Sequence, residues 1–127
     1  MTTTTIDTRL FASPGEMLMD PVHGSIWLHR YEVNLIDQPL FQRLRWITQN
    51  DVTSLVFPGA IHNRFLHSLG ALHISDRLWR TLVSHYLSER ASQYPLSPKE
   101  SASVNYIGRC LRLAALLHDV GHFPFSH

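Results

Sequence analysis

This sequence contains little cysteine, little lysine and almost no net charge in its 127 residues. The single cysteine, Cys110, excludes an internal disulfide bond and a zinc site built on several cysteines. A net charge of +1 argues against nonspecific binding along a nucleic-acid backbone, which needs a basic surface. The sequence has no apolar run of about 18 residues and no secretory signal at its start, so we expect a cytoplasmic protein without a membrane partner.

Histidine and arginine are the residues in excess. The chain has nine histidines, and all but one of its 11 basic residues are arginine, with Lys99 as the exception. Histidine binds metals and transfers protons near neutral pH, and arginine forms paired hydrogen bonds to phosphate groups. With 44% hydrophobic residues the composition is that of a globular domain, and the arginine and histidine bias favours a site for an anionic ligand.

We expect one folded region behind a short arm. Residues 1–16 contain four consecutive threonines and a Ser-Pro-Gly sequence, which predict a flexible N-terminal arm. Residues 17–127 would then make up the folded part. Within it, residues 20–24 (DPVHG) predict a turn, and residues 25–29 (SIWLH) predict a short strand or an extended segment.

Three helices are predicted after this segment. The first covers residues 39–49, with a proline at its first helical position. The second covers about 63–90, and its apolar positions, which extend to Tyr86, predict burial along its length. The third begins after Ser97, where the sequence SPKE is typical of a capping box. Three helices with few strand signals predict an all-α domain.

The end of the third helix carries the most informative residues. His118 and Asp119 are adjacent there, and neighbouring helical residues point about 100° apart. They can therefore hold one ligand together only near a helix end or in a pocket that wraps around it. His122 follows four residues after His118, on the same face if the turn continues. The alternative is that the His-Asp pair simply caps the helix, with a charged His118 facing its dipole.

A second cluster stands at the start of the second helix. Arg64 and His67 are three residues apart and share a helix face, an arrangement that suits a metal-binding histidine beside a phosphate-binding arginine. The alternative is a helix start in which His67 packs beneath a loop. Two such clusters at the ends of two core helices favour a mixed histidine and aspartate metal site, which suits Fe, Mn, Mg, Zn or Co.

Five sequence blocks together resemble a known family. Residues 64–70 (RFLHSLG) and 117–127 (LHDVGHFPFSH) resemble the HD-domain phosphohydrolases. Three further blocks narrow the resemblance to the deoxynucleoside triphosphate triphosphohydrolase branch: residues 20–24 (DPVHG), 41–45 (FQRLR) and 57–60 (FPGA). The resemblance covers about residues 17–127. It implies the N-terminal part of an HD-domain helical bundle, apparently truncated after the helix with the His-Asp motif.

The resemblance also implies roles for individual residues. It makes His67, His118 and Asp119 ligands of a divalent metal ion, and it places Arg64 and Gln49 against the nucleotide substrate. It places His122 and His127 near the phosphates as candidate proton donors. The implied reaction is attack of an activated water at the α-phosphorus, which releases a deoxynucleoside and inorganic triphosphate.

In tetrameric relatives an effector nucleotide is bound by residues equivalent to Asp37, Gln42 and Arg45. The resemblance therefore admits a homo-oligomer with an effector site, and it leaves nucleic-acid binding open. The family's fourth metal ligand, an aspartate on a later helix, is absent from these 127 residues, so we expect a fragment with weak activity or none. Two other functions stay open, namely an HD phosphohydrolase or phosphodiesterase that acts on another nucleotide and a non-catalytic HD module.

Overall fold

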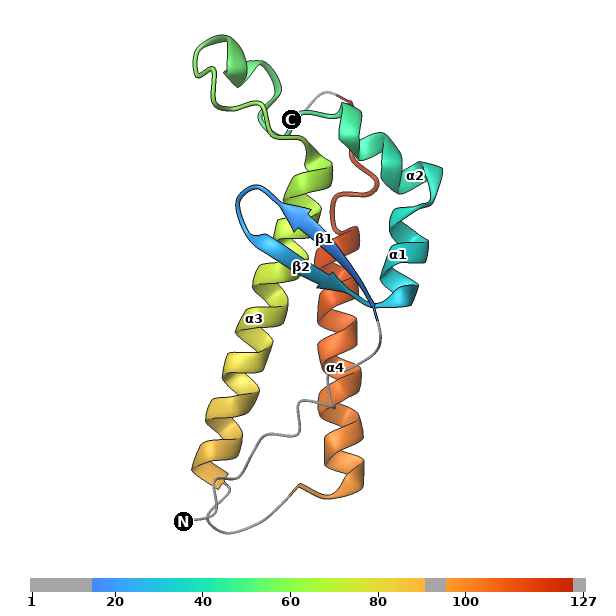
Figure 1. Cartoon of the computed structure of the whole chain (residues 1–127), viewed down its shortest axis with the longest axis vertical. Helices are drawn as coiled ribbons and strands as arrows, with labels where there is room; N and C mark the ends of the chain where they lie inside the picture. The colour runs from blue at the N-terminus through green and yellow to red at the C-terminus, as the bar shows by residue number, and fades with distance from the viewer. Residues whose placement is uncertain (1–14, 91–95, 125–127) are drawn as a thin grey trace.

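The computed structural model describes residues 15–90 and 96–124, and most of the predicted arm lies outside this range. Over these residues the fold is mostly helical, as the all-α prediction required, with a two-stranded sheet in addition (Figure 1). The elements follow one another as β1 (Glu16–Asp20), β2 (Gly24–Leu28), α1 (Arg30–Ile36), α2 (Pro39–Gln42), the 3₁₀ helices η2 (Arg43–Trp46) and η3 (Asp51–Leu55), α3 (Arg64–Arg90) and α4 (Pro98–Leu117).

The strands β1 and β2 form an antiparallel hairpin in which Glu16 pairs with Leu28. The predicted turn joins them. The Asp20 carboxylate accepts hydrogen bonds from the backbone N–H groups of Val22 at 2.9 Å and His23 at 2.7 Å. Gly24 has a φ of +72°, a conformation that favours glycine. The strand over 24–28 agrees with the predicted extended segment, whereas the strand before the turn was not predicted.

Two short helices follow the hairpin. The seven-residue helix α1 was not predicted, although the Glu32 side chain marks its start by accepting the His29 backbone N–H at 2.8 Å. Helix α2 begins at Pro39 as predicted, but it tightens into η2 and does not continue to residue 49. The reason is tertiary, because Ile47 is extended and residues 47–49 pair with residues 62–64 at the start of α3.

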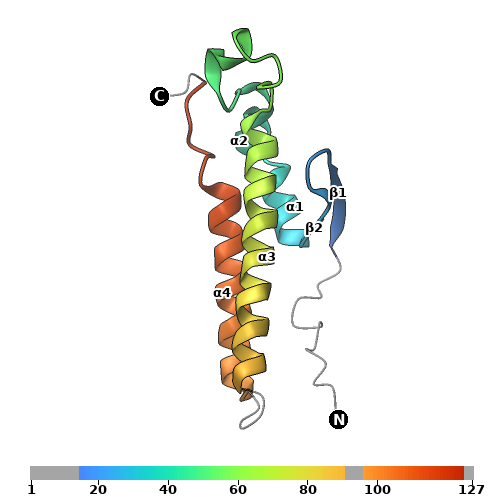
Figure 2. The same cartoon turned by 90° about the vertical axis from the view of Figure 1, so that its left-hand side faces the viewer.

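Helices α3 and α4 are the main elements, and they run antiparallel, side by side, in both of the first two views (Figures 1 and 2). The bounds of α3 agree with the predicted helix over 63–90. The start of α4 has the predicted capping box, in which Ser97 and Glu100 hydrogen-bond each other's backbone N–H groups. No helix within the described ranges is long and apolar enough to cross a membrane. Because α3 and α4 are antiparallel, the start of α3 and the end of α4 lie at the same end of the helix pair.

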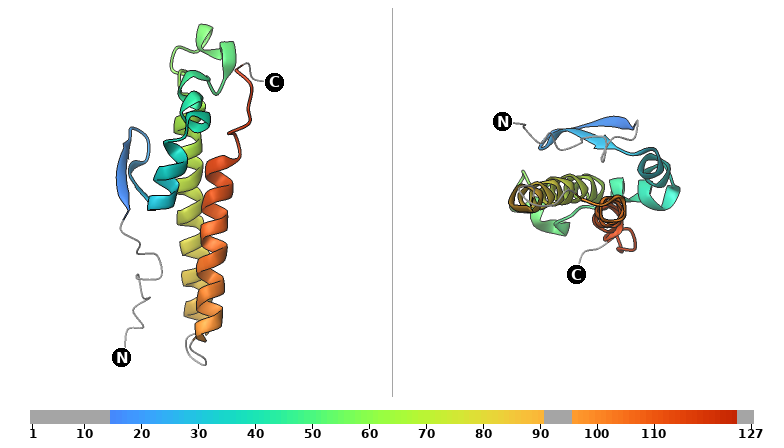
Figure 3. Two further views of the ribbon diagram at one scale, coloured as in Figure 1. Left: turned by 90° about the vertical axis from the view of Figure 1, so that its right-hand side faces the viewer. Right: turned by 90° about the horizontal axis from the view of Figure 1, so that it is seen from below.

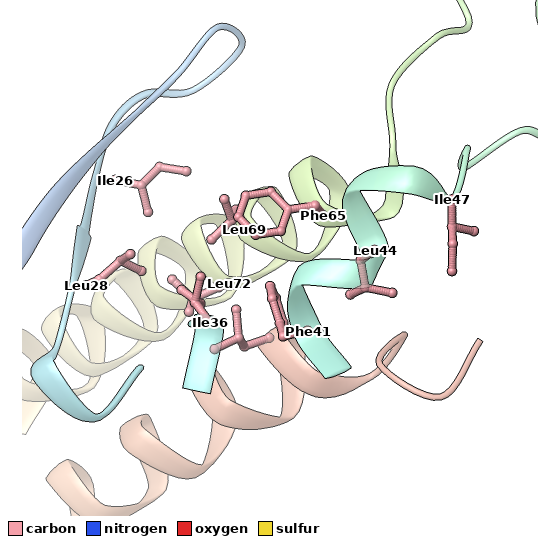
Figure 4. Packing of buried hydrophobic residues seen from close by; sticks show 10 residues of the cluster. Ile26, Leu28, Ile36, Phe41, Leu44, Ile47, Phe65, Leu69 and Leu72 are labelled. Atoms are coloured by element: carbon pink, nitrogen blue, oxygen red, sulfur yellow. The ribbon is translucent and has the colours of Figure 1, made fainter. Parts of the chain in front are cut away.

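The hydrophobic core is concentrated toward that end (Figure 4). The hairpin, α1 and α2 lie along the same part of the helix pair (Figure 3). The buried cluster comes from six elements and from residue 47: Ile26, Leu28, Ile36, Phe41, Leu44, Ile47, Phe65, Leu69, Leu72 and Leu116. The prediction that α3 is buried along its length is wrong, because Leu78, Leu82 and Tyr86 are all more than half exposed.

A buried ion-pair network joins the hairpin to the helices. Arg112 of α4 pairs with Glu32 of α1 through two hydrogen bonds of 2.8 and 2.7 Å. Its guanidinium also donates to the Trp27 carbonyl at 2.8 Å and contacts Asp76 of α3 at 2.9 Å. Glu32 is fully buried and Arg112 is 5% exposed. Sequence analysis did not single out either residue, although an arginine within the apolar segment 110–117 is a signal of a buried pair.

Candidate metal centre

The candidate site is built where the chain enters α3. The backbone N–H of Arg64 donates to the Ile47 carbonyl at 2.8 Å, and that of Gln49 donates to the His62 carbonyl at 3.0 Å. The side chain of Asn63 then accepts the Leu66 backbone N–H at 3.0 Å, which satisfies one free donor of the first helical turn. These contacts fix the first turn of α3, and with it Arg64 and His67, at the end of the helix pair where α3 begins and α4 ends.

The structure brings together the two histidine clusters that the sequence separates. His67, His118 and Asp119 each offer one ligand atom, and these three atoms lie within 4.8 Å of one another. The two histidine Nε2 atoms are 3.3 Å apart, and His118 Nε2 is 3.4 Å from Asp119 Oδ1. The adjacency of His118 and Asp119 is compatible with one centre because both stand where α4 ends.

The hydrogen bond on the far side of His118 suits a metal ligand. His118 Nδ1 lies 2.8 Å from the Ala115 carbonyl oxygen, which can only accept, so Nδ1 carries the proton. In the neutral ring Nε2 then keeps a free lone pair, and this lone pair faces His67 and Asp119. Metal-binding histidines commonly donate their second ring N–H in this way. The Nε2 lone pair of His118 is therefore in a suitable state and position to bind a cation.

Arg64 holds the carboxylate of this cluster. Its guanidinium is 3% exposed and donates from Nη1 to Asp119 Oδ2 at 2.6 Å. Burial alone would raise the pKa of Asp119, but the hydrogen bond from Arg64 and the nearby charge of His118 outweigh burial and keep this pKa below its ordinary value. Asp119 is therefore ionised at neutral pH. The resemblance implied that Arg64 contacts substrate phosphate, and here its anionic partner is Asp119.

The second histidine is neutral under the same conditions. Burial lowers the pKa of His67, and the attraction of Asp119, which acts in the opposite direction, does not restore it. The side chains of His67 and His118 are 37% and 40% exposed, so the cluster is accessible from solvent. Two imidazoles and one carboxylate form a mixed nitrogen and oxygen donor set, which several divalent cations accept.

Of the remaining residues predicted to contact the substrate or donate a proton, Gln49 and His122 lie within the described part of the chain. Gln49 stands beside the start of α3, and its Oε1 is buried without a hydrogen-bond partner among the described residues. His122 is half-buried in the turn after α4, where its backbone N–H donates to the Asp119 carbonyl at 3.0 Å. His127 lies outside the described residues.

The three predicted effector residues gather at the corner between α1 and α2. Gln42 donates to the Ile36 carbonyl at 2.7 Å and accepts a hydrogen bond of 2.7 Å from Arg45 Nε. Asp37 is exposed at the end of α1, directly after Ile36. The Arg45 guanidinium also lies over the Phe65 ring, 3.6 Å from its centroid, so it is partly fixed by the start of α3.

Sequence reasoning missed one residue that contacts the site's backbone. Arg43 donates from Nη2 to the carbonyl oxygens of Val120 at 2.7 Å and His122 at 2.8 Å. Arg43 belongs to the block FQRLR on which the resemblance rested, but its partners lie more than 70 residues later in the sequence. No local pattern could have identified them.

Comparison with known proteins finds sequence similarity to deoxynucleoside triphosphate triphosphohydrolases. No family model matches the chain. It is 42% identical over 112 residues to the deoxynucleoside triphosphate triphosphohydrolase SAMHD1 of Bos taurus, a match that covers 88% of this chain and 17% of that protein. The SAMHD1 of Gallus gallus is 44% identical over 108 residues, covering 85% of this chain and 16% of the relative. This chain therefore spans only a small part of the length of these relatives.

A solved structure has a similar fold over most of this chain. The crystal structure of a hypothetical protein from Aquifex aeolicus matches 89% of this chain and 25% of its own chain, with a TM-score of 0.66 and 37% sequence identity. In sequence, this chain is similar to a partial HD-type region.

Proposed function

We propose that this chain forms part of the active site of a metal-dependent HD phosphohydrolase that acts on deoxynucleoside triphosphates. The observation that carries the proposal is the cluster of His67, His118 and Asp119, whose ligand atoms lie within 4.8 Å of one another although His67 and His118 are 51 residues apart in the sequence. The similarity to SAMHD1 over 88% of the chain supports this choice of reaction over other metal-site functions.

The chain's own residues have distinct tasks in the proposed reaction. His67, His118 and Asp119 would hold a divalent cation, which when bound supplies an activated water and neutralises phosphate charge. Arg64 orients the Asp119 carboxylate and adds positive charge beside the substrate phosphates. Water attacks the α-phosphorus, the bond to the 5′ oxygen breaks, and His122 protonates the departing oxygen. The products are a deoxynucleoside and inorganic triphosphate.

Two further roles complete the proposal. Gln49, whose buried Oε1 has no hydrogen-bond partner among the residues that the structure describes, would contact the sugar of the nucleotide. Asp37, Gln42 and Arg45 would bind an effector nucleotide at the corner between α1 and α2. That second site needs neighbouring subunits, so we propose it only for an assembled homo-oligomer.

Metal binding tests the centre directly. We expect isothermal titration with Mn²⁺ or Co²⁺ to show one site per chain, and His118→Ala to weaken it by at least about tenfold. His85→Ala is the matched control, because His85 is an exposed histidine on the distal part of α3. Equal affinity of the wild type and His118→Ala would exclude this centre.

Product identity tests the reaction. Deoxynucleoside triphosphate is incubated with the metal-loaded chain, and the products are separated by chromatography and ³¹P NMR. Inorganic triphosphate with free deoxynucleoside is the expected pair. Orthophosphate as the sole phosphorus product would contradict the proposal, and pyrophosphate with a nucleoside monophosphate would favour an HD enzyme of another specificity.

A further inference from the structure

Arg43 contacts the end of α4 from a distant part of the chain. It lies where α2 passes into η2, and the residue is half-buried. Its Nη2 donates to the carbonyl oxygens of Val120 and His122, at 2.7 and 2.8 Å. Both carbonyls belong to the turn that immediately follows α4.

The two carbonyl groups that Arg43 contacts lie just beyond the end of α4. Helix α4 ends at Leu117, and the carbonyl groups beyond a helix end have no helical N–H partner. The backbone N–H groups of Val120 and His122 close two tight turns onto Leu117 and Asp119, at 3.1 and 3.0 Å. A cationic side chain there also offsets the partial negative charge at the C-terminal end of the helix. Arg43 supplies the donors that the two outermost carbonyls need.

The same turn carries two residues of the candidate centre. Arg64 fixes the Asp119 side chain, while Arg43 fixes the backbone on both sides of Gly121. We infer that Arg43 is a positioning residue that holds the turn over residues 118–122 and so sets where Asp119 and His122 lie relative to His67. Its consequence for catalysis rests on the proposed function, whereas its hold on the turn is a property of the chain itself.

Arginine suits this position better than lysine. One guanidinium nitrogen serves both carbonyls, and the planar group is fixed by its own geometry. An ammonium group carries three donors but sits on a flexible stem, so a lysine would hold the turn less firmly. We therefore expect partial rescue by Arg43→Lys relative to Arg43→Ala.

Amide hydrogen exchange in the whole chain, measured by NMR, tests the hold on the turn. In Arg43→Ala the amides of Val120 and His122 should exchange about tenfold faster, with Leu69 and Leu72 in the core unchanged. Arg43→Lys should lie between this variant and the wild type. Arg77→Ala, which removes an exposed arginine from α3, is the matched control and should leave all four amides unchanged.

Mn²⁺ titration of the same variants tests the effect on the centre. Arg43→Ala should weaken Mn²⁺ binding about 10-fold or more, and Arg43→Lys should recover part of this affinity. Arg77→Ala should bind Mn²⁺ as tightly as the wild type. The inference is overturned if the turn amides keep their protection, if the core amides lose theirs equally, or if Mn²⁺ affinity is unchanged while the turn loosens. Should Arg43→Ala not fold, Arg43→Lys decides by the same criteria. A wild type that binds no Mn²⁺ would reject the proposed function, and amide exchange would still decide whether Arg43 holds the turn.

Discussion

Glu100 shows at the scale of one residue how local hydrogen bonding changes a carboxylate on the surface. It accepts the Ser97 backbone N–H at 2.9 Å and the Ser97 hydroxyl at 2.8 Å, and Arg90 donates to it at 2.9 Å. These contacts, the Ser97 backbone first, lower the pKa of Glu100 from 4.5 to about 2. The charged form of Glu100 is therefore the one that caps α4.

This shift predicts a pH dependence for the start of α4. Because the pKa of Glu100 is lower in the folded chain, its contribution to stability is complete above pH 4.5 and is lost as the pH falls through about 2. Carboxyl ¹³C NMR should show Glu100 titrating near 2, and Ser97→Ala should move the titration part of the way to 4.5 by removing one hydrogen bond. An unchanged titration in Ser97→Ala would contradict the capping interaction.

At the scale of elements, the contact between α3 and α4 depends on one glycine. A Cβ added to Gly108 of α4 would lie 2.6 Å from the Nε1 atom of Trp79 on α3, so the indole or a whole helix would have to move. Alanine usually stabilises a helix interior relative to glycine by about 1 kcal/mol. At this position the collision reverses the preference.

We therefore predict that Gly108→Ala lowers the free energy of unfolding by about 1–3 kcal/mol, measured by urea denaturation. Gly59→Ala is the control, because a Cβ at Gly59 meets nothing within 4 Å, and it should be nearly neutral. Gly70→Ala should cost less than Gly108→Ala. The group that its Cβ would meet at 2.8 Å is the His23 imidazole on the hairpin turn, which can swing aside. A stabilised Gly108→Ala would show that the helices are not in close contact there.

The elements also show which features a sequence can predict. The helix after Ser97 was predictable because its start is marked by local capping residues, and the helix over 64–90 because it is long. Helix α1 was missed because seven residues give too little periodicity, and α2 was predicted too long because tertiary pairing, not local preference, extends the chain at Ile47.

The candidate site divides in the same way. His67, His118 and Asp119 could be proposed from motif blocks, and the structure places them together, although their role as ligands stays a prediction. The partners of Arg43 and Arg112 could not be proposed, because the carbonyls that Arg43 contacts and the Glu32 carboxylate that Arg112 contacts lie 77 or more residues away in the sequence. Their roles depend on how the whole chain folds.

At the scale of the whole molecule, stability should depend strongly on Arg112. Its removal leaves the carboxylate of Glu32 fully buried and without its cationic partner. We predict that Arg112→Met destabilises the chain by about 3–5 kcal/mol in urea denaturation. The double variant Arg112→Met with Glu32→Leu should recover much of this loss, since the unpaired charge is gone. Equal destabilisation of the single and double variants would show that the pair is not coupled.

Another prediction for the whole molecule concerns the segment between α2 and α3, which extends beyond the N-terminal start of α3 (Figure 1). Six large apolar side chains there are at least 64% exposed: Trp46, Val52, Leu55, Val56, Phe57 and Ile61. Such a patch favours association. Sedimentation velocity should show self-association that rises with concentration and weakens in Leu55→Ser with Phe57→Ser. Tyr106→Ser, an exposed change on α4, should not weaken it, and equal behaviour of all variants would exclude this patch.

The distance between Glu32 and Arg112 along the chain, 80 residues, also sets an order of events during translation. The hairpin and α1 leave the ribosome first, yet the carboxylate of Glu32 cannot be buried cheaply until the arginine of α4 has been made. The hairpin and α1 therefore stay unfolded until α4 has been synthesised, and their apolar residues are accessible to chaperones during this time. We predict that ribosome-bound chains stalled at residue 90 are cut by protease within residues 16–47, whereas the released chain resists. Protection of the stalled chain would show that the hairpin and α1 fold without their partner.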